Sequence, residues 1–148
     1  MKPVRDEDGR RYLLLKRSSE SSLVRDPATG ETRHIPTDQL ETLPGASPLE
    51  MAAAVIDESV RTLLLSIPDE RTLGLVLEID AHGELGVRTI LDRYDFCESD
   101  LHGRLTVLNA AGVLEETTVN GERGYTLTSE ATQAISVLRT ASTTDEDD

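Results

Sequence analysis

Hydrogen-bonding side chains gather in one stretch of the chain, residues 97–112. Within it, Leu101, Leu105 and Leu108 recur at i, i+4 and i+7, which predicts a helix over residues 99–111 with one apolar face. The opposite face would carry Ser99, Asp100, His102, Gly103, Arg104, Thr106 and Asn109. Polar side chains of this kind can form hydrogen bonds with base edges in the major groove of DNA. The stretch is therefore a candidate for recognising a nucleic-acid sequence, and we call it the candidate reader.

Three arginines are candidates for charged contacts with DNA. The planar guanidinium of Arg104 could contact guanine through two hydrogen bonds, or it could pair with Asp100 one helical turn earlier. Arg88 and Arg93 could contact phosphates from a preceding short helix, or pair with neighbouring aspartates. The sequence leaves these alternatives open.

A predicted hairpin follows this helix. Residues 113–119 and 123–127 are β-rich runs that flank Asn120-Gly121, a dipeptide typical of tight hairpin turns. We expect Asn120 and Arg123 near the tip to contact a DNA backbone or a minor groove, although Glu122 offsets the charge of Arg123.

Residues that could do other chemistry are few. No Gly-rich phosphate loop, hydrolase triad or HExxH motif is present, so we expect neither an enzyme nor a bound cofactor. Cys97 is the only cysteine, which excludes an intrachain disulfide. It could be a small buried residue, or a thiol activated by a helix N-terminus. A metal site would need His34, His82 and His102 to converge, so none is expected.

The elements that would position the candidate reader follow a definite order. A helix capped by Asp69 runs to Gly83, a short strand covers 85–87, and a two-turn helix covers 88–94. The predicted reader helix, the hairpin and a final helix that begins at Thr128 or Ser129 come next. Helix, strand, helix, turn, helix, hairpin and helix is the order of a winged helix-turn-helix, in which a brief turn lets two helices cross steeply.

The part of the chain before Asp69 holds two further predicted segments. Residues 10–36 read as two or three short antiparallel strands, with a reversing loop at 26–30. From Ser47, an N-cap followed by Pro48 starts a helical pattern that reaches residue 67 and could be split near Asp57. We therefore predict an α+β protein with three parts: a β-hairpin unit at 1–46, a helix plus winged helix at 47–140, and an acidic disordered tail at 141–148.

Charge distribution argues partly against nucleic acid. The 148-residue chain has a net charge of −13, yet residues 1–40 hold 8 basic and 7 acidic side chains. Arg10, Arg11, Lys16 and Arg17 form a basic patch there, which could contact phosphates or an acidic partner subunit, or could be merely solvated. Of the basic residues, 13 are Arg, and an acidic surface with so little Lys is expected in a salt-rich cytosol. An ordinary acidic protein that avoids nucleic acid is the alternative.

Two motifs resemble those of winged-helix regulators. Residues 97–105 followed by 108–115, which read CESDLHGRL and LNAAGVLE, look like a recognition helix with its A-G-V-L-E ending. Residues 124–128, GYTLT, resemble a second wing strand that leads into a C-terminal helix. Residues 11–17 and 22–27 extend the resemblance to the N-terminal part. The whole chain therefore resembles small winged-helix proteins of salt-loving archaea.

The resemblance implies a transcriptional regulator that binds double-stranded DNA as a homodimer, through the helix from Ser47 or the helix from Thr128. The alternative is a non-catalytic adaptor that uses the same fold to hold a protein partner. No apolar run is long enough to span a membrane and no signal peptide is visible, so a cytoplasmic location is expected.

Overall fold

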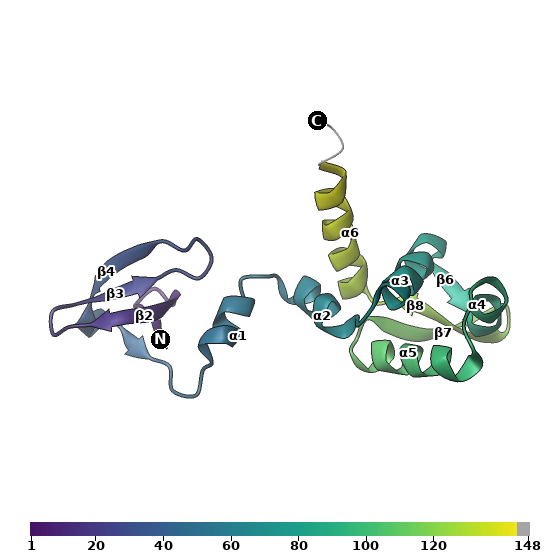
Figure 1. The fold of residues 1–148 in the computed structure, drawn as a ribbon, viewed down its shortest axis with the longest axis horizontal. Helices are drawn as coiled ribbons and strands as arrows, with labels where there is room; N and C mark the ends of the chain where they lie inside the picture. The colour runs from purple at the N-terminus through teal and green to yellow at the C-terminus, as the bar shows by residue number, and fades with distance from the viewer. Residues whose placement is uncertain (145–148) are drawn as a thin grey trace. The chain divides into compact units, whose positions relative to one another are not determined.

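The computed structural model describes residues 1–144, and the side chains of residues 1–142. The protein is α+β and divides into two compact units, unit 1 at Met1–Asp57 and unit 2 at Glu58–Asp148 (Figure 1). The predicted boundary after residue 46 is wrong, because the helix that begins after Ser47 belongs with the strands of unit 1. None of the helices in the described range combines the length and the apolar character that a membrane crossing requires.

Unit 1 is built on an antiparallel sheet of five strands in the order β4-β3-β2-β1-β5. The strands are β1 (Lys2–Arg5), β2 (Arg11–Arg17), β3 (Ser21–Arg25), β4 (Thr32–Pro36) and β5 (Glu41–Thr42), with a 3-10 turn, η1, at Thr37–Gln39. Val4, Tyr12, Val24 and Ile35 form its buried core. The predicted strands are confirmed, and β1 and β5 extend the sheet beyond the prediction.

The helical pattern after Ser47 is split in two, one of the alternatives that the sequence left open. Helix α1 (Pro48–Ala53) begins where the Ser47 hydroxyl accepts a hydrogen bond from the Glu50 amide at 3.3 Å, so the predicted N-cap is confirmed. Helix α2 (Glu58–Ser66) belongs to unit 2.

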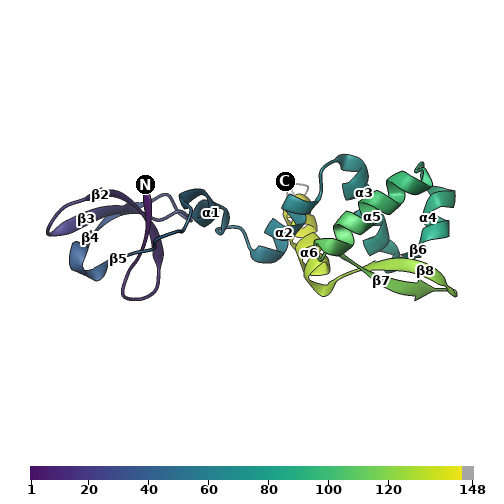
Figure 2. The same ribbon diagram turned by 90° about the horizontal axis from the view of Figure 1, so that it is seen from below.

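Unit 2 has the element order that the sequence predicts. After α2, its elements are α3 (Glu70–His82), β6 (Glu84–Gly86), α4 (Val87–Arg93), α5 (Glu98–Ala110), β7 (Leu114–Val119), β8 (Glu122–Leu127) and α6 (Ser129–Thr144). The three strands pair antiparallel in the order β6-β8-β7. Both views show α4 at the end of the unit where the β7–β8 hairpin turns (Figures 1 and 2).

The hairpin turn follows from two residues with positive φ. Val119 pairs with Glu122, and Asn120 and Gly121 between them have φ values of 51° and 82°. This is the turn type in which Asn-Gly is preferred, because both central residues must be left-handed. In β8, a Cβ on Gly124 would lie 2.8 Å from the carbonyl oxygen of Leu85, so only glycine lets β6 approach this closely.

The core of unit 2 is aliphatic and contains the predicted leucine stripe. Leu101, Leu105 and Leu108 of α5 are at most 2 % exposed, so the apolar face of this helix points inward as predicted. Helix α6 packs against α2. Residues 141–144 of the predicted disordered tail belong to α6, and residues 145–148 lie outside the described residues.

Candidate nucleic-acid interface

The face of α5 opposite the leucine stripe is open to solvent. Its exposed positions include Ser99, His102, Gly103, Thr106 and Asn109. The Thr106 hydroxyl donates a hydrogen bond to the carbonyl oxygen of His102 at 2.8 Å, which leaves its oxygen free to accept another. Five of the seven predicted reader residues therefore share one accessible surface.

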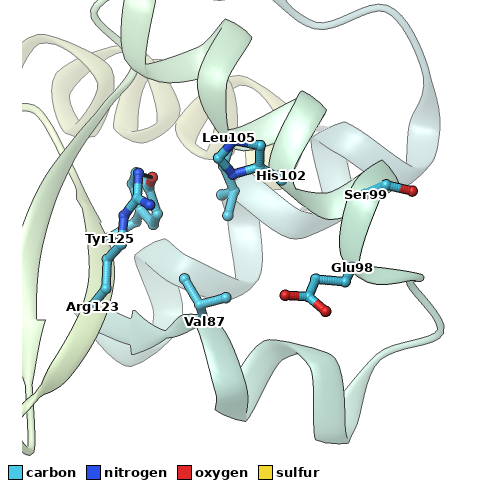
Figure 3. Close-up of a pocket in the computed structure, with 7 residues that line it drawn as sticks. All are labelled: Val87, Glu98, Ser99, His102, Leu105, Arg123 and Tyr125. Atoms are coloured by element: carbon cyan, nitrogen blue, oxygen red, sulfur yellow. Dashed lines mark hydrogen bonds between the residues drawn. The ribbon is translucent and has the colours of Figure 1, made fainter.

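A pocket of about 780 Å³ separates this helix from the hairpin. Its walls are Glu98, Ser99, His102 and Leu105 of α5, Arg123 and Tyr125 of β8, and Val87 of α4 (Figure 3). Val87 and Glu98 point into the space between the helices (Figure 3). The pocket places the predicted hairpin contact Arg123 across from His102, on the same side of the unit.

The charge of Arg123 is shared within the hairpin. Its guanidinium forms an ion pair with Glu116 and donates to the Tyr125 hydroxyl at 2.8 Å. Burial of the ring and the nearby Glu116 raise the pKa of Tyr125. The Arg123 side chain is still 54 % exposed, so it can contact an external anion, but that anion shares the guanidinium with Glu116.

Arg104 does not lie on the exposed face. Its Nη1 atom lies 2.8 and 2.9 Å from the two carboxylate oxygens of Asp69, and also donates to the Thr72 hydroxyl. Its Nε atom donates to Asp100 at 3.1 Å, and its side chain is only 18 % exposed. The expectation that Arg104 points outward is wrong, because this cluster of carboxylates holds the guanidinium against the start of α3.

A second arginine completes the Arg104 cluster, which we define as Asp69, Thr72, Asp100, Arg104 and Arg71. Arg71 lies 3.7 Å from Asp100, donates to the carbonyl oxygen of Asp95, and stacks over the ring of Phe96 at 4.6 Å. Asp100, also expected to face outward, is therefore neutralised by two guanidinium groups.

The Arg104 cluster also changes the acidity of the residue that caps α3. Hydrogen bonds from the Thr72 backbone amide and hydroxyl, together with Arg104, hold the pKa of Asp69 below its usual value. The spacing of Asp100 and Arg104 predicted their pairing, and Asp69 was predicted as the cap of α3. The contact of Arg104 with Asp69 and Thr72, and that of Arg71 with Asp100, were not predicted.

Helix α4 and the hairpin turn carry the remaining predicted contacts. Arg88 and Arg93 are exposed and form no ion pair with any residue of the described range 1–144. Asn120 is exposed at the turn. Of the two alternatives that the sequence left open for these arginines, pairing with neighbouring aspartates does not occur among the described residues.

Cys97 is exposed at the N-cap of α5, so the prediction of a buried residue is wrong. Its sulfur lies 3.5 Å from the Ser99 hydroxyl. This hydrogen bond and one from the Asp100 backbone amide lower the pKa of the thiol. Among the described residues, no group of three or more His, Cys, Asp and Glu side chains is placed to hold a metal ion.

The basic patch predicted in unit 1 is exposed but does not form one cluster. Arg10 precedes β2 and lines a 500 Å³ pocket with Tyr12 and Arg33. Lys16 pairs with Leu23 of β3 and Arg17 pairs with Ser22. Since neighbouring residues of a strand point to opposite faces, Lys16 and Arg17 lie on opposite sides of the sheet.

Comparison with known proteins identifies a family without a known activity. No curated protein and no solved structure matches the chain. One family model does match, over residues 1–139, and that match extends across both units. The chain therefore belongs to DUF7346, a family of unknown function.

Proposed function

We propose that unit 2 is a winged helix-turn-helix domain and that the protein is a transcriptional regulator that binds specific sequences of double-stranded DNA. Two features of unit 2 support this. Its elements follow the winged-helix order, and β6 pairs with β8 beside the β7–β8 hairpin, as expected if that hairpin is a wing.

One observation carries the proposal. Beyond its first residue, Glu98, helix α5 has no unpaired carboxylate, because Asp100 is neutralised by Arg71 and Arg104. Apart from Glu98, its exposed surface is neutral and rich in hydrogen-bonding groups despite the net charge of −13. Such a surface can enter a major groove without repulsion between carboxylates and phosphates.

Each set of residues then has a role. Ser99, His102, Thr106 and Asn109 read base edges, and Gly103 permits close approach of the helix. Arg88 and Arg93 of α4 contact phosphates, and Asn120 and Arg123 of the wing lie along the backbone or the minor groove. Arg104 and Asp100 do not contact DNA in this proposal, because they fix α5 against α3.

The proposed assembly is a homodimer, since two recognition helices about 34 Å apart read two half-sites. Helices α2 and α6 offer the surface for a second copy. Residues 59–68 and 131–144 contain no Asp or Glu, so two highly acidic chains can meet there without repulsion. Leu64, Leu65 and Val137 are exposed on these helices by 57 %, 82 % and 48 %.

A groove between these helices supports the same surface. It has a volume of about 350 Å³ and is lined mainly by apolar side chains, among them Leu63, Leu64, Ile67, Leu73 and Leu138. Exposed apolar surface of this kind is typical of protein contacts.

A second candidate function is a protein adaptor. It is favoured by one observation, that α5 presents no free cation while Val107 on the same helix is 57 % exposed. In this alternative, α5 and the wing hold a protein partner and no DNA is bound.

Selection from a random duplex library in KCl, followed by mobility-shift titration, tests the proposal. We expect enrichment of a partly palindromic sequence. Substitution of His102→Ala with Asn109→Ala should weaken binding to that sequence about tenfold or more, at about 1–3 kcal/mol for each lost base contact. The control Gln39→Ala, at an exposed position of unit 1, should bind as the wild type does. Failure to enrich any duplex would favour the adaptor.

A further inference from the structure

The strands of unit 1 show an uneven distribution of charge. Strands β1 to β4 contain no Asp or Glu. They contain seven basic residues, which are Lys2, Arg5, Arg11, Lys16, Arg17, Arg25 and Arg33. In a chain with a net charge of −13, these four strands concentrate positive charge, and the fifth strand of the sheet, β5, adds one carboxylate, Glu41.

These cations are available, unlike most of those in unit 2. Within the described part of unit 1, Arg5 with Glu41 is the only ion pair. In unit 2, by contrast, Arg71, Arg104, Arg123 and Arg139 are all engaged with carboxylates. Apart from Arg5, the basic residues of these strands can therefore bind an external anion without first breaking an internal ion pair.

Strand register places part of this charge on one face. Lys16 of β2 and His34 of β4 both pair with Leu23 of β3, so the three share a side of the sheet. Arg25 is two residues after Leu23 and therefore points the same way. We call Lys16, Arg25 and His34, all exposed and on three adjacent strands, the basic face.

Binding of DNA needs cations that unit 2 does not supply in sufficient number. Contacts with phosphates provide nearly all of the non-specific affinity of a protein for DNA and a large share of its specific affinity. In the described part of unit 2, Arg88 and Arg93 form no ion pair, and Arg123 is shared with Glu116. The carboxylates of unit 2 greatly outnumber these arginines. A winged helix in this chain would have the groups that read bases but few that hold the backbone.

We propose that the basic face of unit 1 binds the phosphate backbone of duplex DNA, as a second, sequence-independent contact that supplements the winged helix. This inference rests on the proposed function for its ligand. In this inference, unit 1 adds affinity for DNA of any sequence, and unit 2 provides the preference for a particular sequence.

The test compares full-length variants by mobility shift over a KCl series, on the selected duplex and on an unrelated duplex. Each phosphate contact contributes about 0.9 to the slope of log K against log salt, so Lys16→Ser with Arg25→Ser should reduce the slope by about 1.8. Binding at low salt should weaken about tenfold or more on both duplexes, with the preference between them unchanged.

Two controls separate this effect from others. The exchange Lys16→Arg with Arg25→Lys keeps the charge and should keep the slope. Ala52→Glu with Ala53→Glu lowers the net charge by the same two units at exposed positions of α1, and should change the slope less than the Ser variant does. Thermal unfolding of each variant shows whether unit 1 is intact.

The outcomes distinguish the two proposals. An unchanged slope in a folded Ser variant, with the sequence preference present, overturns the inference and leaves the winged-helix proposal standing. A reduced slope without any sequence preference in the wild type supports the basic face and overturns the proposed specificity. If the Ser variant instead changes only the oligomeric state in sedimentation, the face binds the acidic surface of a second copy, and the inference is overturned.

Discussion

The Nη1 atom of Arg104 on α5 lies between the two carboxylate oxygens of Asp69, the residue that caps α3, at 2.8 and 2.9 Å. Asp69 serves two helices at once, because it also accepts the Thr72 amide at 2.8 Å. The carboxylate of Asp69 therefore links the start of α3 directly to α5.

The stability of unit 2 should decrease in acid because of Asp69. Its pKa in the folded state is lower than in the unfolded state, so its contribution is complete above about 3.8, the ordinary pKa, and is lost as the pH falls through the lower folded value. Thermal unfolding as a function of pH measures this. The Asp69→Asn variant should be less stable near neutral pH and should lose less stability on acidification.

Arg104→Ala should lower the Tm of unit 2 by a few degrees, and Arg104→Lys should not restore it. The guanidinium donates to Asp69 through Nη1 and to Asp100 through Nε, and the single ammonium group of a lysine cannot reproduce this geometry. Arg88→Ala, at an exposed and unpaired arginine, is the matched control and should leave the Tm unchanged. Equal Tm values for the two alanine variants would contradict the role assigned to the cluster.

Gly103→Ala should raise the stability of unit 2 and weaken DNA binding. A Cβ at this position meets nothing within 4 Å, and alanine in a helix interior is favoured over glycine by about 1 kcal/mol. Against DNA, the added methyl group would hinder the close approach that the proposal assigns to Gly103. Chemical unfolding and mobility shift measure the two effects, and a variant that binds DNA at least as tightly as the wild type would place Gly103 outside the interface.

Gly124→Ala should have the opposite effect on stability. The new Cβ would clash with the Leu85 carbonyl oxygen at 2.8 Å and with a Val119 methyl group at 2.6 Å. Forcing extra volume into such a site costs about 1–3 kcal/mol, measured by chemical unfolding. Retention of wild-type stability would show that β6 and β8 can separate without loss.

Leu65→Glu should convert the proposed dimer to a monomer, as measured by sedimentation. Leu65 is 82 % exposed, so the substitution leaves the core intact, but it places a charge within residues 59–68, which contain no other carboxylate. Leu49→Glu, at a site 81 % exposed in unit 1, should leave the assembly unchanged. A wild-type chain that sediments as a monomer would remove the basis for the dimer.

The thiol of Cys97 should react with iodoacetamide at lower pH than a free cysteine. The hydrogen bond from the Ser99 hydroxyl is the largest cause of its lowered pKa, so Ser99→Ala should move the midpoint of the rate profile to higher pH. Ser129→Ala, at an exposed position of α6, is the control and should not move it. Coincident profiles for all three proteins would contradict the assignment.

Local patterns predicted most of unit 2. The leucine stripe of α5, the Asn120-Gly121 turn and the order of elements are each encoded within a few residues, and all are confirmed. The Ser47 cap is of the same kind.

What the sequence did not reveal depends on residues far apart in the chain. Asp69 and Arg104 are separated by 35 positions, so no spacing rule links them, and the helical pattern of α5 placed Arg104 on the outside. Strands β1 and β5 span 4 and 2 residues, too few to show an alternating pattern. The boundary at Asp57 depends on packing of α1 against β1, which is also a long-range property.

Each unit encloses a tyrosine of its own. Tyr12 is 2 % exposed in the core of unit 1 and Tyr125 is 1 % exposed in the core of unit 2, and the chain has no tryptophan. With Tyr94 and Tyr125 replaced by Phe, all tyrosine fluorescence would come from unit 1. In this double variant, the fluorescence of Tyr12 would report on unit 1 alone during a DNA titration, without a contribution from unit 2.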